Sequence, residues 1–395
     1  MTKVGILTLH LHVNYGGILQ AAALYRLLED EGFDPLFLRK DPDNISRTGR
    51  LARNLLRVLP GQNFGGVRAR ARLRAKHEPF IRRFLPNITR PSHDGAELRR
   101  AVEQHGVDAV VVGSDQVWRS EYHHDSHYQA YFLDFVPPGV RRLSYAASFG
   151  HSNWQHPDKT ADIAALLDDF DAVSVRERSG ADICRDVLGR GQCEIVLDPT
   201  LVVDPLFYQE VAGSFQPPLQ PSLVSYVLDE GEGTKIASKA VRAALPASYA
   251  TIPLSIEEEG QEATIEQWMR AFMSADFVLT DSYHGTIFSI LFGKNFITLA
   301  NVDRGMDRFT TLLSSLGLSD RLVLDPEPSR IASLVRQDID YAQVNQRLAA
   351  LRQTSREFLL SALGRGIPVS ERGSADLTFA PGRRFPAAAL GGQFA

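Results

Sequence analysis

Short apolar runs alternate with amphipathic segments along most of this chain. The run VGILTL at 4–9 is followed by polar residues, two glycines and an amphipathic segment from 18 to about 32, and the next apolar run covers 33–38. A strand, a glycine turn, a helix and another strand are the opening of a parallel α/β sheet. The same alternation predicts further strands at 108–112, 142–147, 171–175 and 194–197.

A second and smaller alternation follows the proline-containing stretch 202–221, which we interpret as a hinge. Strands are expected at 223–228, 249–253, 276–280 and 296–299, with helical segments between them. Two such α/β halves resemble the GT-B architecture of many glycosyltransferases. We therefore predict two Rossmann-like domains that face a central cleft, with ligands at the carboxyl ends of the strands.

The domain boundaries follow from these alternations. The predicted divisions are an N-terminal domain at 1–205 with a basic helical insert at about 40–92, a C-terminal domain at 206–340, a helix at 341–363 that crosses back to the N-terminal domain, and a loosely held tail at 364–395. The tail is rich in Gly, Pro and Ala, which is typical of chain ends that are not tied to a core.

Composition narrows the classes of function. The chain has 395 residues and a net charge of -4, so no global positive field selects nucleic acid. The chain has only two cysteines, no signal-peptide pattern and no run of 18 apolar residues. These features indicate a cytoplasmic protein without a membrane span. The segment 39–90 carries 12 Arg and 2 Lys against 3 acidic residues. It is either a solvated helical surface or a site for an anionic partner, such as a phosphate-bearing substrate or a membrane surface.

Two polar clusters follow predicted strands of the N-terminal domain. Asn14 and Tyr15 precede a glycine pair at the start of the first helix, where free N–H groups favour anions; the alternative is a plain tight turn. In the motif GSDQVW, Asp115 could accept a proton from a sugar hydroxyl, and Trp118 could stack on a sugar ring. The alternative there is a helix cap formed by Ser114 or Asp115.

Three further places in this half of the chain carry candidate chemistry. His151 follows a predicted strand and can titrate near neutral pH, or it is an ordinary loop histidine. Arg176 follows the next strand and either faces the cleft or forms a structural ion pair with Glu177 or Asp198. The loop EYHHDSH at 121–127 spaces two histidines as metal ligands can be spaced, but we interpret it as a surface loop and predict no metal site.

The strongest cluster is the segment TDSYHGTIFSIL, which begins at Thr280. Ser282 is a natural N-cap for the following apolar helix, so His284 falls in the first helical turn, beside free N–H groups that favour a phosphate or a carboxylate. A purely structural cap is the alternative. One loop later, Arg304 and Arg308 suit the grip of a multiply charged anion, or they mark a solvated helix start.

Six segments, taken in order, resemble the polysaccharide pyruvyl transferase family. They are GILTLHLHVNYGGILQAAAL, DAVVVGSDQVW, YFLDFVPPGVRRLSYAASFG, AVSVRERSG, VLDPTLVVD and TDSYHGTIFSILFGKNF. The resemblance runs from residue 4 to about residue 317. It implies a GT-B-like fold, with the acceptor on the N-terminal domain and the donor on the C-terminal domain. It also implies transfer of pyruvate from phosphoenolpyruvate to a sugar, as a ketal, without a metal or a cofactor.

The resemblance implies how the donor is held. Characterised members of the family grip phosphoenolpyruvate with an Arg-x-His pair. Here the histidine matches His284, but the arginine position holds Ser282. Either Arg304, Arg308 or Arg176 supplies the missing cation, or this branch uses a different donor.

On this interpretation His284 binds the donor and serves as the acid, and Asp115 or His151 serves as the base. The residues expected to hold the sugar are Asn14, Tyr15, Gln116 and Trp118. The expected acceptor is a cell-envelope or exopolysaccharide unit, either linked to a polyprenyl diphosphate or part of a finished polymer. The basic segment 39–90 is expected to make peripheral contact with anionic lipid at the inner membrane face. The rival functions are a GT-B glycosyltransferase that uses a nucleotide sugar and a non-catalytic carbohydrate-binding protein.

Overall fold

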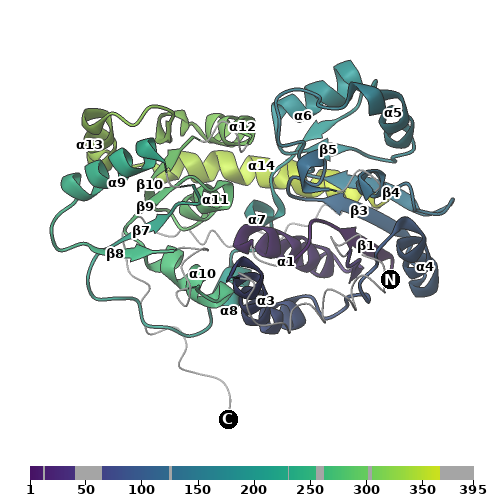
Figure 1. The fold of residues 1–395 in the computed structure, drawn as a ribbon, viewed down its shortest axis with the longest axis horizontal. Helices are drawn as coiled ribbons and strands as arrows, with labels where there is room; N and C mark the ends of the chain where they lie inside the picture. The colour runs from purple at the N-terminus through teal and green to yellow at the C-terminus, as the bar shows by residue number, and fades with distance from the viewer. Residues whose placement is uncertain are drawn as a thin grey trace, which may run out of the picture. The chain divides into compact units, whose positions relative to one another are not determined.

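The computed structural model describes residues 1–11, 14–40, 65–123, 127–229, 231–254, 262–300 and 305–364. These residues form two compact units, each built on a parallel β-sheet (Figure 1). The first unit comprises the described residues up to Val203 together with 305–312 and 350–364, and the second comprises 204–300 and 313–349.

The first sheet has the strand order β2-β1-β3-β4, and all of its strands are parallel. These strands are β1 (Lys3–Leu7), β2 (Asp34–Phe37), β3 (Ala109–Gly113) and β4 (Arg141–Tyr145). A short parallel pair, β5 (Ser174–Val175) and β6 (Glu194–Ile195), continues the sheet beside β4 through isolated bridges. The strands expected at 171–175 and 194–197 are therefore present, but they are shorter than predicted.

Helices flank the first sheet, and local sequence sets their ends. They are α1 (Tyr15–Asp30), α3 (Gly65–Phe84), α4 (Gly95–His105), α5 (Thr160–Asp168), α6 (Arg178–Asp182) and α7 (Pro199–Val202), with a π-helical turn at Ile183–Val187 and 3-10 turns at Ser120–Tyr122, Gln129–Phe132 and Pro157–Lys159. Asp94 caps α4 by accepting a hydrogen bond from the Glu97 N–H at 2.8 Å, and Gly106, with φ +61°, ends it.

The first sheet is buried on both faces, as a parallel sheet covered by helices must be. All of β3 is buried, and so is most of α1, which lies beside β1 (Figure 1). The core around Val110, Trp118 and Phe132 continues to Ile163 and Leu167 of α5. This burial holds the strands in place, so the side chains that follow them are presented from a fixed edge.

The second unit repeats the plan with the strand order β11-β10-β9-β7-β8, again all parallel. Its strands are β7 (Ser222–Tyr226), β8 (Ala250–Pro253), β9 (Phe277–Thr280), β10 (Asn295–Leu299) and β11 (Leu322–Val323). Its helices are α8 (Leu206–Ala212), α9 (Glu232–Ala244), α10 (Ile265–Ser274), α11 (Tyr283–Leu291) and α13 (Pro328–Arg336), and a 3-10 turn lies at Ser319–Arg321. Thr264 and Gln267 form a capping box at the start of α10, with hydrogen bonds of 3.2 and 2.8 Å. The proline-containing stretch expected as a hinge contains α8.

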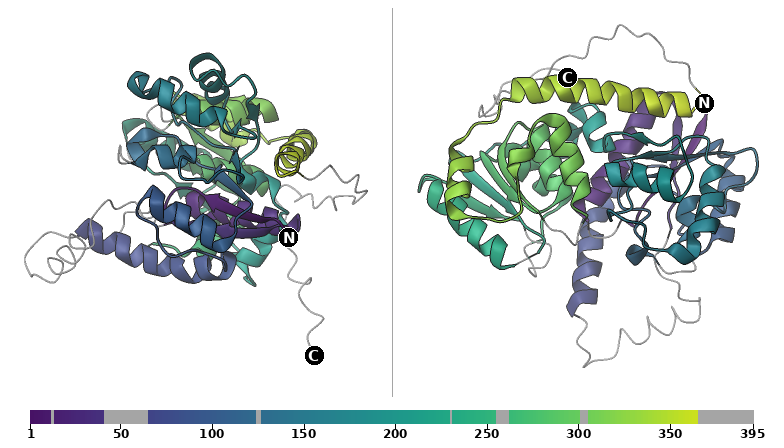
Figure 2. Two further views of the ribbon diagram at one scale, coloured as in Figure 1. Left: turned by 90° about the vertical axis from the view of Figure 1, so that its right-hand side faces the viewer. Right: turned by 90° about the horizontal axis from the view of Figure 1, so that it is seen from above.

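Two helices, α12 (Asp307–Leu316) and α14 (Tyr341–Ala362), have residues in both units. Figure 2 shows α14 as one continuous helix. Near its start Tyr341 donates to the Lys294 carbonyl oxygen of the second unit at 2.5 Å. Farther along, Ser355 accepts from the Leu197 N–H of the first unit at 2.9 Å. In the part of the chain described, no helix is both long and apolar enough to cross a membrane.

Two of the predicted divisions fall partly outside the described residues. Helix α3 lies in the segment expected as a basic insert, and 41–64 of that segment are not described. Of the expected tail, only Gly364 is described.

Candidate functional site

Polar side chains gather where the strands of the first sheet end. The chain passes from β1 to β2 on one side and returns to β3 on the other, so the strand order reverses between β1 and β3. Ligands of open α/β sheets bind beyond the carboxyl ends of the strands at such a reversal. Thr8, Asp115, Ser148 and Arg176 follow β1, β3, β4 and β5, and all four are buried. This edge is the candidate site of the first unit.

Asp115 is held in one orientation beside the start of α1. Its φ of +71° is rare for residues other than glycine. Its Oδ1 accepts hydrogen bonds from the Gln116 N–H at 2.9 Å and from Arg176 Nη2 at 3.1 Å. Its Oδ2 lies 3.3 Å from where a Cβ on Gly17 would be, so this glycine lets the carboxylate approach the helix. A backbone turn and an ion pair therefore fix the carboxylate.

Arg176 forms buried ion pairs, one of the two alternatives that the sequence left open. Its Nη2 pairs with Asp115, its Nη1 lies 3.1 Å from Asp198 Oδ2, and its side chain is 0% exposed. Asp198 also accepts from Ser114 Oγ and from Thr200 Oγ1, both at 2.6 Å. Buried charges need such partners because an unpaired one is strongly destabilising. Arg176 thus ties the ends of β3 and β5 to the start of α7.

Two more charged side chains are buried in the same cluster. Glu177 accepts from the Phe149 N–H at 2.9 Å, and burial raises the pKa of its carboxyl group although Arg176 acts in the opposite direction. Burial, followed by the charge of Arg176, lowers the pKa of Arg308 to about 10. Arg308 therefore stays protonated at neutral pH, and Asp115 is among the charges with which it interacts.

His151 pairs with a carboxylate at the end of β4. Its Nε2 lies 2.6 Å from Glu121 Oε1, and the imidazole is partly exposed. Burial acts to raise the pKa of Glu121, but hydrogen bonds from its own backbone and from His151 bring it below its ordinary value. Gly150, with φ +70°, lets the side chains of Gln116 and Arg119 approach its backbone. A carboxylate that orients an imidazole is a recurrent arrangement for general acid–base catalysis.

The residues predicted to hold a sugar at the start of α1 differ in exposure. Asn14 is exposed and, as the N-cap residue, makes no capping hydrogen bond with its side chain. Tyr15 is buried, and its ring meets the ring of His77 edge-on at 5.1 Å. Asn14 is therefore the accessible member of the pair.

The two predicted sugar residues after β3 are both buried. Gln116 accepts from the Tyr122 hydroxyl at 3.0 Å, which joins it to the segment that carries Glu121. Trp118 is 1% exposed and stacks on Phe132 at 5.1 Å inside the core. A sugar could reach the ring of Trp118 only if that side chain left the core.

The histidine loop shows two separate environments. His123 Nε2 lies 2.7 Å from the Val117 carbonyl oxygen, and burial lowers the pKa of His123 to about 4. His127 Nδ1 lies 3.0 Å from Lys40 Nζ. Within the described residues, which leave out 124–126, no three His, Cys, Asp or Glu side chains are grouped to hold a metal ion.

Asp281 occupies the matching edge of the second unit. The strand order there reverses between β7 and β9, and Asp281 directly follows β9. Its Oδ1 accepts from the Leu228 N–H at 2.7 Å, and its Oδ2 accepts from the Asp229 N–H at 2.9 Å. Both of its oxygens therefore bind the loop that follows β7.

Ser282 and His284 lie at the start of α11, at the positive end of its dipole. Ser282 caps the helix by accepting from the Gly285 N–H at 3.3 Å, so the structural cap considered as an alternative is formed. His284 is 5% exposed, and its ring meets that of Tyr283 edge-on at 5.7 Å. The sequence thus located this pair correctly at a helix N-terminus.

The arginines predicted to complete the donor site are not both described. Arg304 lies outside the described residues. Arg308 belongs to the first unit, where it joins the cluster of Asp115 and Arg176, and His284 belongs to the second unit.

Sequence reasoning did not identify two members of the first cluster. Glu121 stands 30 residues before His151, in the 3-10 turn Ser120–Tyr122, so no periodic pattern links the two. Thr8 donates to the Ser114 carbonyl oxygen at 3.0 Å and accepts from Gln20 Nε2 at 3.0 Å. The available signal for Thr8 was a polar residue at the end of an apolar run.

One family model matches most of the chain. It is described as polysaccharide pyruvyl transferase, and it matches residues 14–304. The matched segment includes Asn14, Asp115, His151 and His284. A search of curated proteins finds no match.

Several solved structures resemble this chain at low sequence identity. A putative UDP-N-acetylglucosamine 2-epimerase from Listeria monocytogenes is 10% identical with a TM-score of 0.51, covering 91% of this chain and 95% of that chain. The N-terminal domain of Candida albicans trehalose-6-phosphate phosphatase is 11% identical with a TM-score of 0.52, covering 93% and 97%. The UDP complex of S. aureus MnaA is 11% identical with a TM-score of 0.50, covering 92% and 97%. The likeness concerns the fold alone, and it confirms the predicted α/β fold of the GT-B type with two Rossmann-like sheets.

Proposed function

Since this chain belongs to the polysaccharide pyruvyl transferase family, we propose that it transfers the pyruvyl group of phosphoenolpyruvate to two hydroxyl groups of one sugar in a cell-envelope or exopolysaccharide unit. The product is a pyruvate ketal. The family match over residues 14–304 carries the proposal, because it spans the polar clusters at the strand ends of both units. Transferase chemistry follows from the family; the donor and the acceptor class are our proposal.

The reaction needs an acid, a base and positive charge. An acid protonates the methylene carbon of phosphoenolpyruvate, and a sugar hydroxyl attacks the adjacent carbon as it loses its proton. A second hydroxyl of the same sugar displaces the phosphate, which leaves with the remaining proton. Fixing donor and acceptor together can lower the barrier by about 7–11 kcal/mol, and each acid or base adds about 10²–10⁴-fold.

His151 is the proposed base. Its contact of 2.6 Å with Glu121 supports the role, because the carboxylate holds the imidazole in one orientation. The imidazole is also partly exposed, as a group that meets a substrate must be. Glu121 acts through His151 and is therefore a positioning residue.

Asp115 is proposed to orient the attacking hydroxyl. Its Oδ1 is occupied by Arg176 and the Gln116 N–H, and an arginine partner weakens a carboxylate as a base. Accepting a hydrogen bond from the hydroxyl requires no proton transfer. Asn14 next to it is proposed to contact the sugar, and Tyr15, Gln116 and Trp118, which are buried behind it, are proposed to support that edge.

The donor is proposed to bind at the start of α11. The positive end of its dipole favours a phosphate or a carboxylate, and His284 in its first turn can donate a proton. Arg304 is the proposed source of the cation that Ser282 does not provide, because Arg176 is committed to Asp115 and Asp198 and Arg308 belongs to the same cluster of the first unit. We propose a cytoplasmic location, which the two free cysteines of the structure support.

The test is a direct assay for the product. The protein is incubated with phosphoenolpyruvate and a panel of glycosides that carry free hydroxyl pairs, and the products are analysed by mass spectrometry together with phosphate release. We expect a ketal with one class of glycoside, and a loss of about 10²–10⁴-fold in kcat for His151→Ala and for His284→Ala. His105→Ala, on the exposed last turn of α4, is the matched control and should keep full activity.

Ligand-induced stabilisation separates this proposal from its rival. Helix α11 carries no acidic residue to hold the ribose of a nucleotide sugar. Phosphoenolpyruvate should therefore raise the melting temperature, and UDP- and GDP-sugars should not. Stabilisation by a nucleotide sugar with no ketal from any glycoside would overturn the proposal.

A further inference from the structure

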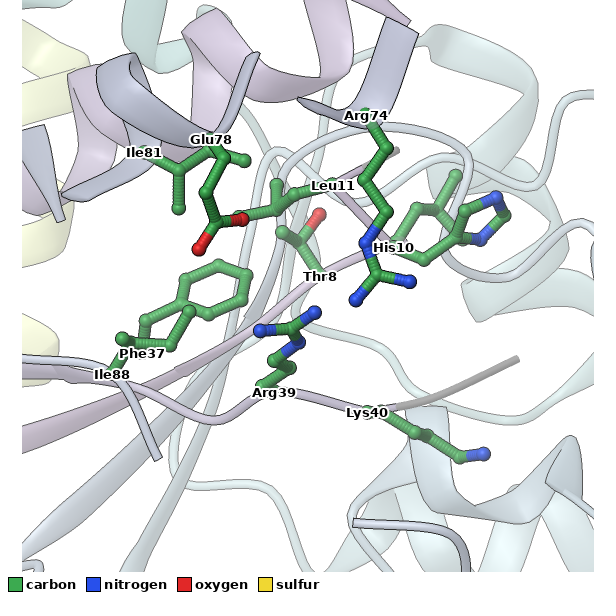
Figure 3. A pocket seen from close by; sticks show the side chains of 11 residues that line it. Thr8, His10, Leu11, Phe37, Arg39, Lys40, Arg74, Glu78, Ile81 and Ile88 are labelled. Carbon is green, nitrogen blue, oxygen red and sulfur yellow. The ribbon is translucent and has the colours of Figure 1, made fainter. Parts of the chain in front are cut away.

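Two features of the first unit have no part in the proposed function. One is the cavity at the ends of β1 and β2, which Arg39 and Arg74 help to line (Figure 3). Its volume of about 20 Å³ holds little more than one water molecule, so it suits no larger ligand. The other feature is a pair of cysteines, Cys184 and Cys193, which are the only two in the chain.

The fold brings these two thiols into contact. Cys184 lies on the π-helical turn Ile183–Val187 and is 0% exposed. Cys193 directly precedes β6 and packs against the same apolar core, and a hydrogen bond joins the two side chains. Two cysteines in contact can close to a disulfide without a large movement of the backbone.

A sharp reversal of the chain holds the pair together. Gly189, with φ +73°, follows the π-helical turn, and glycine adopts this left-handed conformation at no steric cost. The Arg190 N–H then donates to the Cys184 carbonyl oxygen at 2.7 Å, and Arg190 Nη2 donates to the Phe170 carbonyl oxygen at 2.9 Å. These hydrogen bonds fix the reversal that carries the chain from Cys184 back to Cys193.

The two thiols differ in their protonation and their access to solvent. The hydrogen bond with Cys193, followed by burial, raises the pKa of Cys184 well above its ordinary value, so Cys184 keeps its proton at neutral pH and donates it to the Cys193 sulfur. Cys193 is partly exposed, and Gly191, Gln192 and Glu194 around it are exposed, so a small oxidant can reach its sulfur. In a redox-active pair the accessible thiol attacks the oxidant, and the neighbouring thiol resolves the product.

We propose that Cys184 and Cys193 form a peroxide-sensitive redox site that closes to a reversible disulfide. The oxidant is a hydroperoxide, for which hydrogen peroxide is the probe. Disulfides of proteins in reducing compartments are usually transient and often sense oxidants, so the site is compatible with a cytoplasmic location. It goes beyond the proposed function, because it needs neither phosphoenolpyruvate nor turnover.

The oxidation proceeds in two steps that consume one hydrogen peroxide. The Cys193 sulfur, as a thiolate, attacks one peroxide oxygen and breaks the O–O bond, which leaves a sulfenic acid on Cys193 and a hydroxide that takes up the thiol proton as water. The Cys184 sulfur then attacks the Cys193 sulfur, the S–O bond breaks, and the departing hydroxide leaves as water with the Cys184 proton. Two thiols are thus oxidised to one disulfide while one peroxide is reduced to two waters. Closure prevents the further, irreversible oxidation of Cys193 to a sulfinic acid.

The disulfide would anchor an edge strand of the first unit. Both residues of β6 are exposed, and among the described strands β6 pairs only with β5. Cys193 stands at the start of β6, and Asp198, which accepts from Arg176 at 3.1 Å, follows its end. A cross-link at Cys193 therefore ties the strand that leads to the polar cluster to the turn after α6.

The thiols of the full chain provide the test. The reduced protein is exposed to hydrogen peroxide, its remaining thiols are alkylated after unfolding, and its peptides are analysed by mass spectrometry. We expect the free thiols to fall from two to zero, with peptides joined through Cys184 and Cys193, and we expect dithiothreitol to restore both thiols. The oxidised protein should also melt at a higher temperature than the reduced protein, because the cross-link restricts the unfolded chain.

Two variants separate the attacking thiol from the resolving thiol. In Cys184→Ala, Cys193 should stop at the sulfenic acid, which dimedone traps. In Cys193→Ala, Cys184 should stay reduced at the same peroxide concentration, because it is buried. Labelling of Cys184 rather than Cys193 in these variants would reverse the two roles and contradict the proposal.

The original protein alone can also overturn the proposal, whether or not the variants fold. An oxidised Cys193 beside a reduced Cys184, a cross-link between two chains, or two thiols that survive peroxide would each do so. A lower melting temperature after oxidation would show that the disulfide forms only by distorting the fold, and would equally count against the site. None of these results bears on the proposed function, which ketal formation by the reduced protein tests separately.

Discussion

The two units place an aspartate at the same topological position and hold it in different ways. Asp115 follows β3 and Asp281 follows β9, and each of these strands lies next to the first strand of its sheet, at the reversal of strand order. Asp115 is held by the buried guanidinium of Arg176 and one N–H group. Asp281 is held by two N–H groups of a neighbouring loop.

The difference shows that one topology can prepare two kinds of site. In the first unit, buried arginines already balance the carboxylate, so the site can orient a neutral hydroxyl without a large local charge. In the second unit, Asp281 fixes the loop after β7, and Ser282 leaves the start of α11 with its positive dipole. This contrast is what the proposed sugar site of the first unit and the proposed donor site of the second unit would require.

The largest expected effect comes from removing the charge that holds Asp115. Arg176→Met leaves Asp115 and Asp198 buried without their partner, and breaking a buried pair in this way costs about 3–5 kcal/mol. Urea unfolding should show this loss. Arg185→Met removes ion pairs with Asp182 and Asp186 on an exposed helix and should change the free energy of unfolding very little. Equal effects of the two changes would show that the Asp115 network is not a buried charge network.

The corresponding change in the second unit is Asp281→Ala. It leaves the Leu228 and Asp229 N–H groups without their acceptor, at a cost of about 2–4 kcal/mol for two such groups. Asp281→Asn keeps one acceptor oxygen and should lose less. If Asp281→Asn proves as destabilising as Asp281→Ala, the negative charge of Asp281 matters more than its two hydrogen bonds, and the contrast between the units disappears.

The first unit should also be the more sensitive to acid. Burial lowers the pKa of His123 from 6.5 to about 4, so the folded state binds a proton less readily than the unfolded chain. The stabilising contribution of the neutral His123 side chain is complete above about pH 6.5 and is lost as the pH falls toward 4, by about 3 kcal/mol in all. His123→Leu should flatten that part of the stability profile, as followed by urea unfolding between pH 7 and pH 4. An unchanged slope would contradict the assignment to His123.

The sequence predicted the sheets and the strand ends better than it predicted the partners of each side chain. Strand positions and the cap at Ser282 follow from local patterns, since apolar periodicity and capping act within a few residues. The pairing of His151 with Glu121 and of Arg176 with Asp115 joins residues that are 30 and 61 positions apart. Such contacts depend on strand order, which one sequence does not specify. Trp118 shows why local sequence did not predict the partners of a side chain, because an aromatic residue after a strand packs in a core as readily as it binds a sugar.

An added methyl group should lower the free energy of unfolding more at Gly285, at the start of α11, than at Gly17, at the start of α1. A Cβ on Gly285 would overlap Thr280 Oγ1, which donates to the Tyr226 carbonyl oxygen at 2.6 Å. Gly285→Ala should therefore cost about 1–3 kcal/mol. A Cβ on Gly17 would meet Asp115 Oδ2 at 3.3 Å, at the end of a side chain, so Gly17→Ala should affect stability less and raise the KM for the sugar. The reverse order of stabilities would contradict the packing described here.

The smallest expected effect concerns the two N-cap residues, and it separates the two roles open to Ser282. Ser282→Ala removes the capping hydrogen bond of α11 and should cost about 1 kcal/mol, whereas Asn14→Ala removes no capping bond of α1 and should cost less. Ser282→Asp keeps a capping acceptor but adds a negative charge where a phosphate is proposed to bind. If Ser282 lies at the donor site, Ser282→Asp keeps the melting temperature and raises the KM for phosphoenolpyruvate at least tenfold more than Ser282→Ala does, since a like charge is introduced. If Ser282 is a cap and nothing more, both variants leave the KM for phosphoenolpyruvate unchanged. That result would contradict the proposal that the donor binds at the start of α11.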